Sequence, residues 1–335
     1  MVLLTEEVVE EILLRFPPAE PASLVRAALV CKPWCRLISG RRFHRRFREF
    51  HRSPPVLGFL GNLVGRRGPA PRFFPASPAC PPLADLERWR WLKLEARHGR
   101  VLLGSEAFGP PHLVVWDPVT GKRWELPPPS DVWHPNHWNA AVLCAASGGA
   151  CDHLHCRGVP FLVVFVGSDA EQISLCTYSS EAGSWSEPTF AATAFEYAGG
   201  VDRVPTALVG NSLYFMIDMG YSMLGYDLIT RKTSVIDHTP AKSIHDPTEP
   251  MVMEDGGILV AVENYNRLFL WSMEEKPKGD IVWAQIRVIE LNKLLPANAL
   301  PNALPVYANC FAFVCGVGIL VGTNGRLCII DLKSD

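Results

Sequence analysis

The amino-acid sequence predicts a small all-α unit over residues 1–50, followed by an all-β domain over residues 51–335. Three observations predict this division. Apolar residues recur with helical spacing in the first 50 residues, and short β-rich runs separated by turn residues fill the rest of the chain. A strand-turn pattern also recurs at intervals of roughly 45–60 residues. Such a repeat is typical of the blades of a β-propeller, and the copies fit five to six blades.

Proline, glycine and one capping residue mark the limits of the predicted helices. The first helix begins after Thr5, a residue type that caps helices, and ends at the proline pair 17–18. A second helix opens at Pro21 and a third at Pro33, because proline is tolerated in the first helical turn. Gly40 ends the third helix.

The segment from Arg36 to Arg52 holds seven arginines, with Phe43, Phe47 and Phe50 between them. We expect a short amphipathic helix with the phenylalanines facing inward and the arginines facing outward. A nucleic-acid patch or a nuclear localisation signal is the alternative. We expect no nucleic-acid partner, because the chain as a whole has a net charge of -2.

The all-β domain is predicted from apolar runs rich in β-branched and aromatic residues. These runs cover residues 112–116, 160–167, 173–178, 211–217, 257–262, 267–271, 318–322 and 326–330. Turn residues separate them, at Gly210-Asn211, Asp255-Gly256 and Asn324-Gly325. The strand-turn pattern begins near Trp116, Tyr178, Tyr226, Leu270 and Ile330, and the copy at Leu270 has a longer loop than the others.

The last copy of the pattern reaches Asp335, the final residue, without a return strand. The outer strand of the last blade is therefore missing, or another segment supplies it, for which Val56–Leu63 is the candidate. A missing strand would leave the propeller incompletely closed at its C-terminal end. Whether Asp335 is the natural end of the chain stays open.

Composition excludes two locations. No apolar run approaches the ~18–20 residues that span a bilayer, so no membrane partner is expected. The apolar N-terminal segment carries four glutamates and lacks a basic region, unlike a secretory signal. We therefore expect the cytoplasm, the nucleus or both, with the ten cysteines as reduced thiols.

Two segments carry a family resemblance. Residues 4–38, LTEEVVEEILLRFPPAEPASLVRAALVCKPWCRLI, resemble the F-box, with LVCKxW at residues 29–34 as the most specific motif, and residues 41–59 look like the continuation found in plant F-box proteins. WDPVTGKRWELPPP at residues 116–129 looks like the motif of F-box-associated, kelch-like propeller domains. Thr5 stands where the family usually has proline.

The resemblance implies a substrate-receptor subunit of an SCF-type ubiquitin ligase. Its F-box would dock on a Skp-type adaptor, and through it on a cullin scaffold, while the C-terminal domain would choose an unknown target protein. No residue of the chain would then be catalytic.

The helical unit offers more apolar surface than three short helices can hide from one another, so a partner is expected to cover the surplus. The predicted adaptor-binding residues are Leu4, Ile12, Leu13, Leu24, Val30, Cys31 and Trp34, with Trp34 as the strongest contact. The alternative is that they form intramolecular core, and that is what we expect for Val25 and Leu37.

An aromatic cluster at residues 133–138 follows a run of prolines and is loop-like. The predicted target-binding residues are Trp133, His134, His137 and Trp138. Trp138 could equally be core.

Other chemical signals are weak. Cys144, Cys151, His153, His155 and Cys156 lack the spacing of common zinc sites, so no metal is expected. The glycines between residues 316 and 322 precede a hairpin instead of a helix, which excludes a dinucleotide fingerprint, and no cofactor is expected. The alternative function is a propeller enzyme or ligand-binding protein with a helical appendage, which would need acidic or metal-binding residues at the propeller channel.

Overall fold

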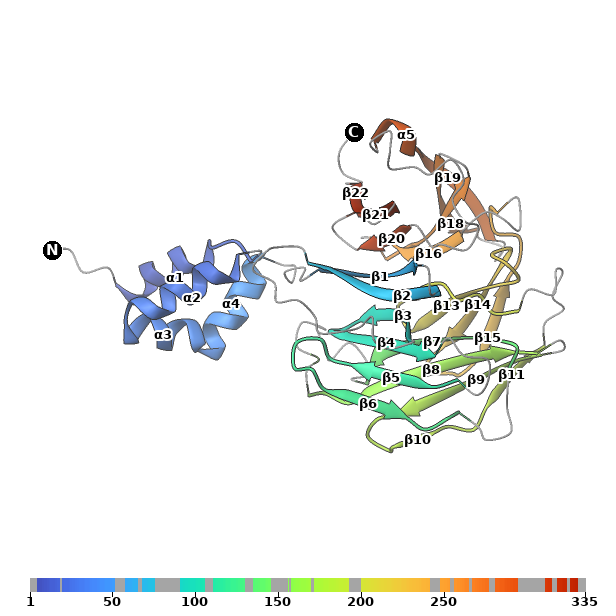
Figure 1. The fold of residues 1–335 in the computed structure, drawn as a ribbon, viewed down its shortest axis with the longest axis horizontal. Helices are drawn as coiled ribbons and strands as arrows, with labels where there is room; N and C mark the ends of the chain where they lie inside the picture. The colour runs from blue at the N-terminus through green and yellow to red at the C-terminus, as the bar shows by residue number, and fades with distance from the viewer. Residues whose placement is uncertain are drawn as a thin grey trace. The chain divides into compact units, whose positions relative to one another are not determined.

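The computed structural model has four N-terminal helices followed by antiparallel sheets (Figure 1). The helices are α1 (Glu6–Leu14), α2 (Pro21–Val30), α3 (Lys32–Ser39), α4 (Arg41–His51) and the short α5 (Leu291–Leu294). The strands are β1 (Gly58–Gly65), β2 (Gly68–Pro75), β3 (Trp91–Arg97), β4 (Arg100–Ser105), β5 (Leu113–Trp116), β6 (Arg123–Leu126), β7 (His137–Cys144), β8 (Phe161–Ser168), β9 (Gln172–Ser179), β10 (Ser184–Trp185), β11 (Thr189–Ala192), β12 (Ala207–Val209), β13 (Ser212–Ile217), β14 (Ser222–Asp227), β15 (Thr233–Ile236), β16 (Thr248–Val252), β17 (Ile258–Asn264), β18 (Arg267–Glu275), β19 (Ile281–Glu290), β20 (Phe311–Val314), β21 (Gly318–Thr323) and β22 (Arg326–Ile330).

The structure describes residues 5–18, 20–51, 58–65, 68–75, 91–105, 111–129, 135–145, 156, 158–169, 172–192, 200–241, 248–253, 256–264, 267–276, 281–294, 311–314, 318–323 and 326–330. The chain divides into two compact units, residues 1–60 with 73–84 and residues 61–72 with 85–335. We name the first the helical unit, after α1 to α4, and the second the β-unit, which holds the sheets from β3 to β22.

The helix boundaries follow the residues that mark them in the sequence. Pro21 and Pro33 lie in the first turns of α2 and α3, and Gly40 directly follows α3. Thr5 lies at the N-cap position of α1, but its side chain makes no capping hydrogen bond, so the predicted cap is right in place and wrong in mechanism. Hydrogen bonds from the backbone N–H of Glu7 and from the Thr5 hydroxyl instead lower the pKa of the Glu7 carboxyl.

The helical unit has its own apolar core. Its buried side chains are Val9, Leu13, Leu14, Ala27, Ile38 and Phe43, and Phe47 packs against them. Phe50, which we expected to face inward with these phenylalanines, is exposed. The structure therefore confirms the amphipathic helix predicted from the arginine-rich segment. The predicted inward direction is correct for two of its three phenylalanines.

Ionic and polar contacts join α1 to α4. The buried carboxylate of Glu10 lies 2.8 Å from Nη1 of Arg46, which also pairs with Glu11. At the end of α4, Nε2–H of His51 donates a hydrogen bond to the carbonyl of Leu14, with 2.7 Å between the two atoms. Carbonyls in the last turn of a helix lack an intrahelical donor, so His51 satisfies one that α1 leaves free.

Within the described residues, strands β3 to β22 of the β-unit form five successive sheets. The first has the strand order β3-β4-β5-β6, the third β12-β13-β14-β15 and the fourth β16-β17-β18-β19. The second has the order β10-β9-β8-β7, with β11 also paired to β9, and the fifth has the order β20-β21-β22. Strands adjacent in the chain are therefore adjacent in each sheet, except that β11 pairs with β9 and not with β10.

The first four sheets pack face to face, each on the next, through separate apolar clusters. One cluster joins the first and second sheets, another joins the second and third, and another joins the third and fourth. In β8, Val163 and Phe165 belong to the cluster shared with the first sheet, and Val164 and Val166 to the cluster shared with the third. Because side chains alternate across a strand, a strand buried on both faces has a continuous apolar sequence.

The structure corrects the prediction for Val56–Leu63. Within the described residues, β1 pairs with β2, and the fifth sheet has three strands. β1 therefore does not supply a fourth strand to the fifth sheet.

The repeated turns have one backbone geometry. In the first sheet the N–H of Gly121 donates to the carbonyl of Asp117, at 2.9 Å, and in the third the N–H of Arg231 donates to the carbonyl of Asp227, at 2.8 Å. The second sheet has the same bond from Gly183 to Ser179, at 2.8 Å. The residues that donate these bonds have φ values of 72°, 56° and 68° respectively. Glycine fits this left-handed conformation, and arginine is strained in it.

Replacing Arg231 by glycine should therefore stabilise the protein. We expect Arg231→Gly to raise the free energy of unfolding by up to about 1 kcal/mol, and Gly121→Ala to lower it by about 1 kcal/mol. Chemical denaturation of both variants measures this. A loss of stability in Arg231→Gly would contradict the strain argument.

Substitution of two phenylalanines of the second sheet can test the burial of β8 between two neighbouring sheets. Phe165 is fully buried and stacks on Trp138, whereas Phe190 is exposed on β11. Phe165→Ala should lower the free energy of unfolding by about 3–5 kcal/mol, because it removes buried area and leaves a cavity. Phe190→Ala, the matched control, should change it by less than about 0.5 kcal/mol. Equal losses in the two variants would contradict the packing described.

Candidate partner-binding face and buried polar network

Several aliphatic side chains of α1 and α2 point away from the core of the helical unit. We name them the exposed aliphatic face: Val8, Ile12, Val25, Leu29 and Val30, which are 44%, 46%, 58%, 80% and 67% exposed. Residues four apart lie on the same side of a helix, so Val8 with Ile12 and Val25 with Leu29 form short stripes. A helix with apolar side chains on two sides packs on two partners or leaves one side uncovered.

The predicted adaptor-binding residues fall into two groups. Ile12, Val30 and Cys31 are exposed. Leu24 and Trp34 are partly buried against the core. Trp34 can thus contact a partner only through the part of its ring that the core leaves uncovered.

Two of the predicted residues belong to neither group. Leu13 is fully buried in the core, so its assignment to the contact surface is wrong. It lies in the stripe formed with Val9, on the side of α1 that the other helices cover. Leu4 lies outside the described residues.

The sequence reasoning also missed part of the exposed face. Leu37 packs against the core as predicted, but Val25 is exposed and not core. Leu29, the most exposed of the large aliphatic residues described, was not predicted as a contact residue. Its spacing of four from Val25 was the available signal.

The predicted target-binding residues are separated by burial. Trp138 is only 3% exposed and lies with its ring centroid 5.7 Å from that of Phe165, so it is core and not a contact residue. The guanidinium of Arg203 lies 4.3 Å from the centroid of the Trp138 ring. His137, its neighbour on β7, is exposed. Trp133 and His134 lie outside the described residues.

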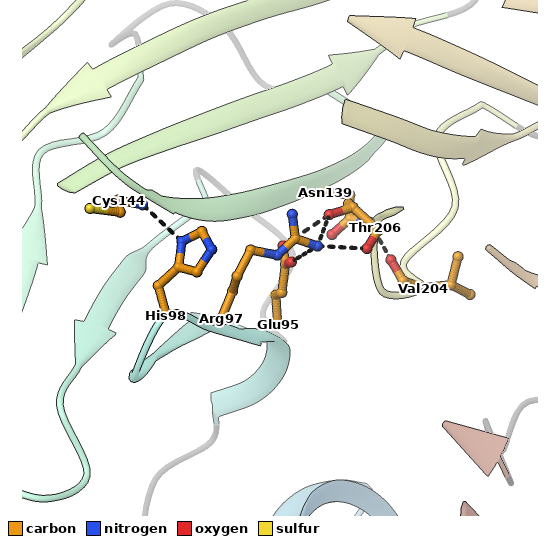
Figure 2. A network of polar contacts seen from close by, with 7 residues as sticks. All are labelled: Glu95, Arg97, His98, Asn139, Cys144, Val204 and Thr206. Atoms are coloured by element: carbon orange, nitrogen blue, oxygen red, sulfur yellow. Dashed lines mark hydrogen bonds and ion pairs between the residues drawn. The ribbon is translucent and has the colours of Figure 1, made fainter. Parts of the chain in front are cut away.

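The interior of the β-unit contains a network of polar side chains (Figure 2). Glu95 and Arg97 of β3 form an ion pair, and the hydroxyl of Thr206 donates to Oε2 of Glu95, at 3.0 Å. Nη2 of Arg97 donates to the carbonyl of Thr206, at 2.8 Å. The pair therefore links the first sheet to the segment that leads into β12 of the third sheet.

A second link comes from the second sheet. Nδ2 of Asn139 on β7 donates to the carbonyls of Asp202 and Val204, at 2.9 and 2.7 Å. The segment from residue 202 to 206 thus receives hydrogen bonds from two other sheets. Buried polar groups that are satisfied in this way fix one arrangement of the chain.

A carboxylate of the fourth sheet also acts electrostatically on this region. Burial lowers the pKa of the Lys93 ammonium, while the carboxylates of Glu249 on β16 and of Glu95 act in the opposite direction. Burial raises the pKa of Glu95, against the opposing effects of Arg97 and Thr206. Burial in this interior therefore disfavours the charged form of both the ammonium and the carboxyl group.

Lys93 is held through its backbone by an amide. The side chain of Asn62 on β1 donates to the carbonyl of Lys93 and accepts from its N–H, both at 2.8 Å. An amide side chain has the donor and acceptor of a peptide group, so Asn62 pairs with β3 as a neighbouring strand would.

The predicted metal-like cluster is only partly described. Cys144 and Cys156 are buried, and the N–H of Cys144 donates to Nδ1 of His98, at 3.1 Å. Cys151, His153 and His155 lie outside the described residues. Within the described part of the chain, no three His, Cys, Asp or Glu side chains gather closely enough to hold a metal ion.

The helices that the structure describes are four to eleven residues long. None of them is both long enough and apolar enough to cross a lipid bilayer.

Comparison with a family model identifies the helical segment. Residues 2–46 match the F-box domain. These residues form an F-box domain. The exposed aliphatic face lies entirely within it, and the all-β part follows it in the chain.

The similarities to solved structures are distant, and no curated protein matches the chain. TolB from Acinetobacter baumannii is 12% identical, with a TM-score of 0.38 over 70% of this chain and 53% of TolB, so the chain spans about half the length of that protein. Hsv2 of Kluyveromyces lactis is 10% identical, with a TM-score of 0.35 over 71% of this chain and 76% of Hsv2. A luciferin-regenerating enzyme is 13% identical, with a TM-score of 0.31 over 60% of this chain and 62% of the enzyme.

Asp202 gives the network a dependence on pH. Burial raises the pKa of its carboxyl from 3.8 to about 7, in part opposed by hydrogen bonds from the N–H groups of Gly220 and Met219. The folded protein therefore binds a proton more tightly than the unfolded chain does. This stabilisation is complete below about pH 4 and is lost as the pH rises through about 7.

Asp202→Asn keeps an acceptor for Gly220 and removes the titration. Relative to the original chain, we expect the variant to be more stable at pH 8, by at most about 4 kcal/mol, with the difference shrinking toward pH 4. Urea unfolding of both proteins between pH 4 and pH 8 measures this. A difference that stays constant over that range would contradict the assignment to Asp202.

Proposed function

We propose that the chain is the substrate-recognition subunit of an SCF-type ubiquitin ligase. Its F-box domain binds a Skp-type adaptor and, through the adaptor, a cullin scaffold. Its β-unit recruits a target protein. The proposed location is the cytoplasm, the nucleus or both.

The exposed aliphatic face within residues 2–46 carries this proposal. Single exposed aliphatic residues are common, but here five of them are concentrated on α1 and α2. An adaptor that covers this face would gain roughly 25 cal/mol for each Å² of apolar surface removed from water. Ile12, Leu24, Val30, Cys31 and Trp34 are the proposed contact residues, together with Leu29.

We extend the proposal to the β-unit, as an F-box-associated, kelch-like β-propeller of five to six blades of the class found in plants. The support is the succession of sheets in chain order, the first four of which pack each on the next through an apolar cluster. The repeated turns of the first three sheets also support it. The proposed target contacts are Trp133, His134 and His137.

The mechanism is proximity. A receptor that holds a target lysine near a charged ubiquitin-conjugating enzyme raises the effective concentration of the two reactants. In this proposal the chain binds and orients its target, and the residues of the chain form or break no covalent bond of the target.

The adaptor interface can be tested with single exposed residues. Co-expression of the full chain with a Skp-type adaptor should give a stoichiometric complex in size-exclusion chromatography and mass measurement. Ile12→Asp and Leu29→Asp should each weaken binding at least tenfold, about 1.4 kcal/mol, because a charge would be buried at the interface. Trp34→Ala should also weaken it, as the removal of a partly exposed aromatic anchor.

The matched control is Ile229→Asp, which makes the same replacement at an exposed residue of the β-unit. It should bind the adaptor as the original chain does. Thermal melting of each variant checks that the helical unit stays folded. Failure of the intact, folded chain to bind the adaptor would overturn the proposal, and unchanged binding by both aspartate variants would overturn the assigned face.

A further inference from the structure

Five cysteines whose side chains the structure describes fall into two classes. Cys144, Cys156 and Cys176 of the β-unit are buried, whereas Cys31 and Cys35 of the helical unit are exposed. Burial raises the pKa of the Cys176 thiol to about 12, so it remains protonated at neutral pH. Because the thiolate is the nucleophile in thiol exchange, Cys176 is both inaccessible and unreactive at neutral pH.

The exposed cysteines form a pair at the start of α3. Cys31 is the N-cap residue of this helix, and its carbonyl accepts the first helical hydrogen bond from the N–H of Cys35, at 3.0 Å. The two residues are thus one helical turn apart. Leu29 and Val30, the most exposed aliphatic residues of α2, directly precede Cys31.

Two exposed basic residues flank this pair along α3. Each cysteine is followed by an exposed basic residue, Lys32 after Cys31 and Arg36 after Cys35. α3 contains no acidic residue. Exposed cations of this kind raise the local concentration of small anions, and glutathione and its disulfide are anionic at neutral pH. Reactive cysteines in proteins lie in such electropositive, accessible places.

We propose that Cys31 and Cys35 form a thiol-modification site for a glutathione-type disulfide, and that its modification prevents adaptor binding. This inference rests on the proposed function. In the reaction, the thiolate of either cysteine attacks one sulfur of glutathione disulfide, and the disulfide bond of the reagent breaks. One glutathione stays on the protein as a mixed disulfide, and the other leaves as a thiolate that takes up the proton lost by the cysteine. A reducing thiol reverses the reaction.

The position of the adduct explains the expected effect. A glutathionyl group on Cys31 or Cys35 brings carboxylates to the edge of the exposed aliphatic face, beside Leu29 and Val30. An adaptor that covered this face would have to bury those charges without partners. We expect the modified chain to bind a Skp-type adaptor at least tenfold more weakly than the reduced chain.

Modification and binding are measured separately on the full chain. Reduced protein is incubated with glutathione disulfide, and the modified residues are located by peptide fragmentation in a mass spectrometer. We expect adducts on Cys31 or Cys35 and none on Cys144, Cys156 or Cys176, which serve as internal controls. Adducts on the buried cysteines, or none on the exposed pair, would overturn the inference.

Adaptor affinity is then measured before and after the incubation. The original chain should lose affinity and regain it with dithiothreitol. The variant carrying both Cys31→Ser and Cys35→Ser, compared with its own reduced state, should show no change. A loss of affinity in that variant, or no loss in the modified original chain, would overturn the inference. Failure of the reduced chain to bind the adaptor would instead overturn the proposed function, and the inference with it.

Discussion

The β-unit depends on one constraint, the burial of its second and third sheets on both faces. Val163 and Phe165 of β8 face one neighbouring sheet, and Val164 and Val166 face the other, so both faces of this central strand are buried. A single sheet of this composition in water would expose an apolar face that it cannot cover itself. The order of the first four sheets in space therefore follows their order in the chain, because each one packs on the sheet before it.

Buried polar contacts determine the relative placement of the sheets more closely than apolar packing alone does. Apolar clusters join successive sheets, but the ion pair of Glu95 with Arg97 and the bonds of Asn139 connect the first two sheets to residues 202–206, which lead into the third. Apolar packing tolerates small shifts, whereas buried hydrogen bonds require a particular geometry. The network therefore fixes the relative placement of sheets that the clusters bring together.

The sequence predicts backbone features better than the directions of side chains. Helix limits at Pro21, Pro33 and Gly40 and the repeated turns depend on local preferences, and the structure confirms them. Errors arose where an apolar residue had two possible environments, as with Leu13, Val25 and Trp138. When a helix has apolar residues on two sides, its sequence does not show which side packs against the other helices of the unit. The links of Arg97 and Asn62 join distant segments, and no local pattern reveals them.

Packing in chain order also has a consequence for synthesis on the ribosome. The F-box domain emerges first and can close its own core before any sheet exists. Each of the first three sheets of the β-unit then has an uncovered apolar face until the next one has been translated and folded onto it. Translation at ≈ 5–20 residues per second leaves such a face open for seconds, long enough for chaperones to bind it. A pause in translation between two of these sheets would therefore keep an apolar face uncovered for longer. A premature stop there would release a chain in which that face stays uncovered.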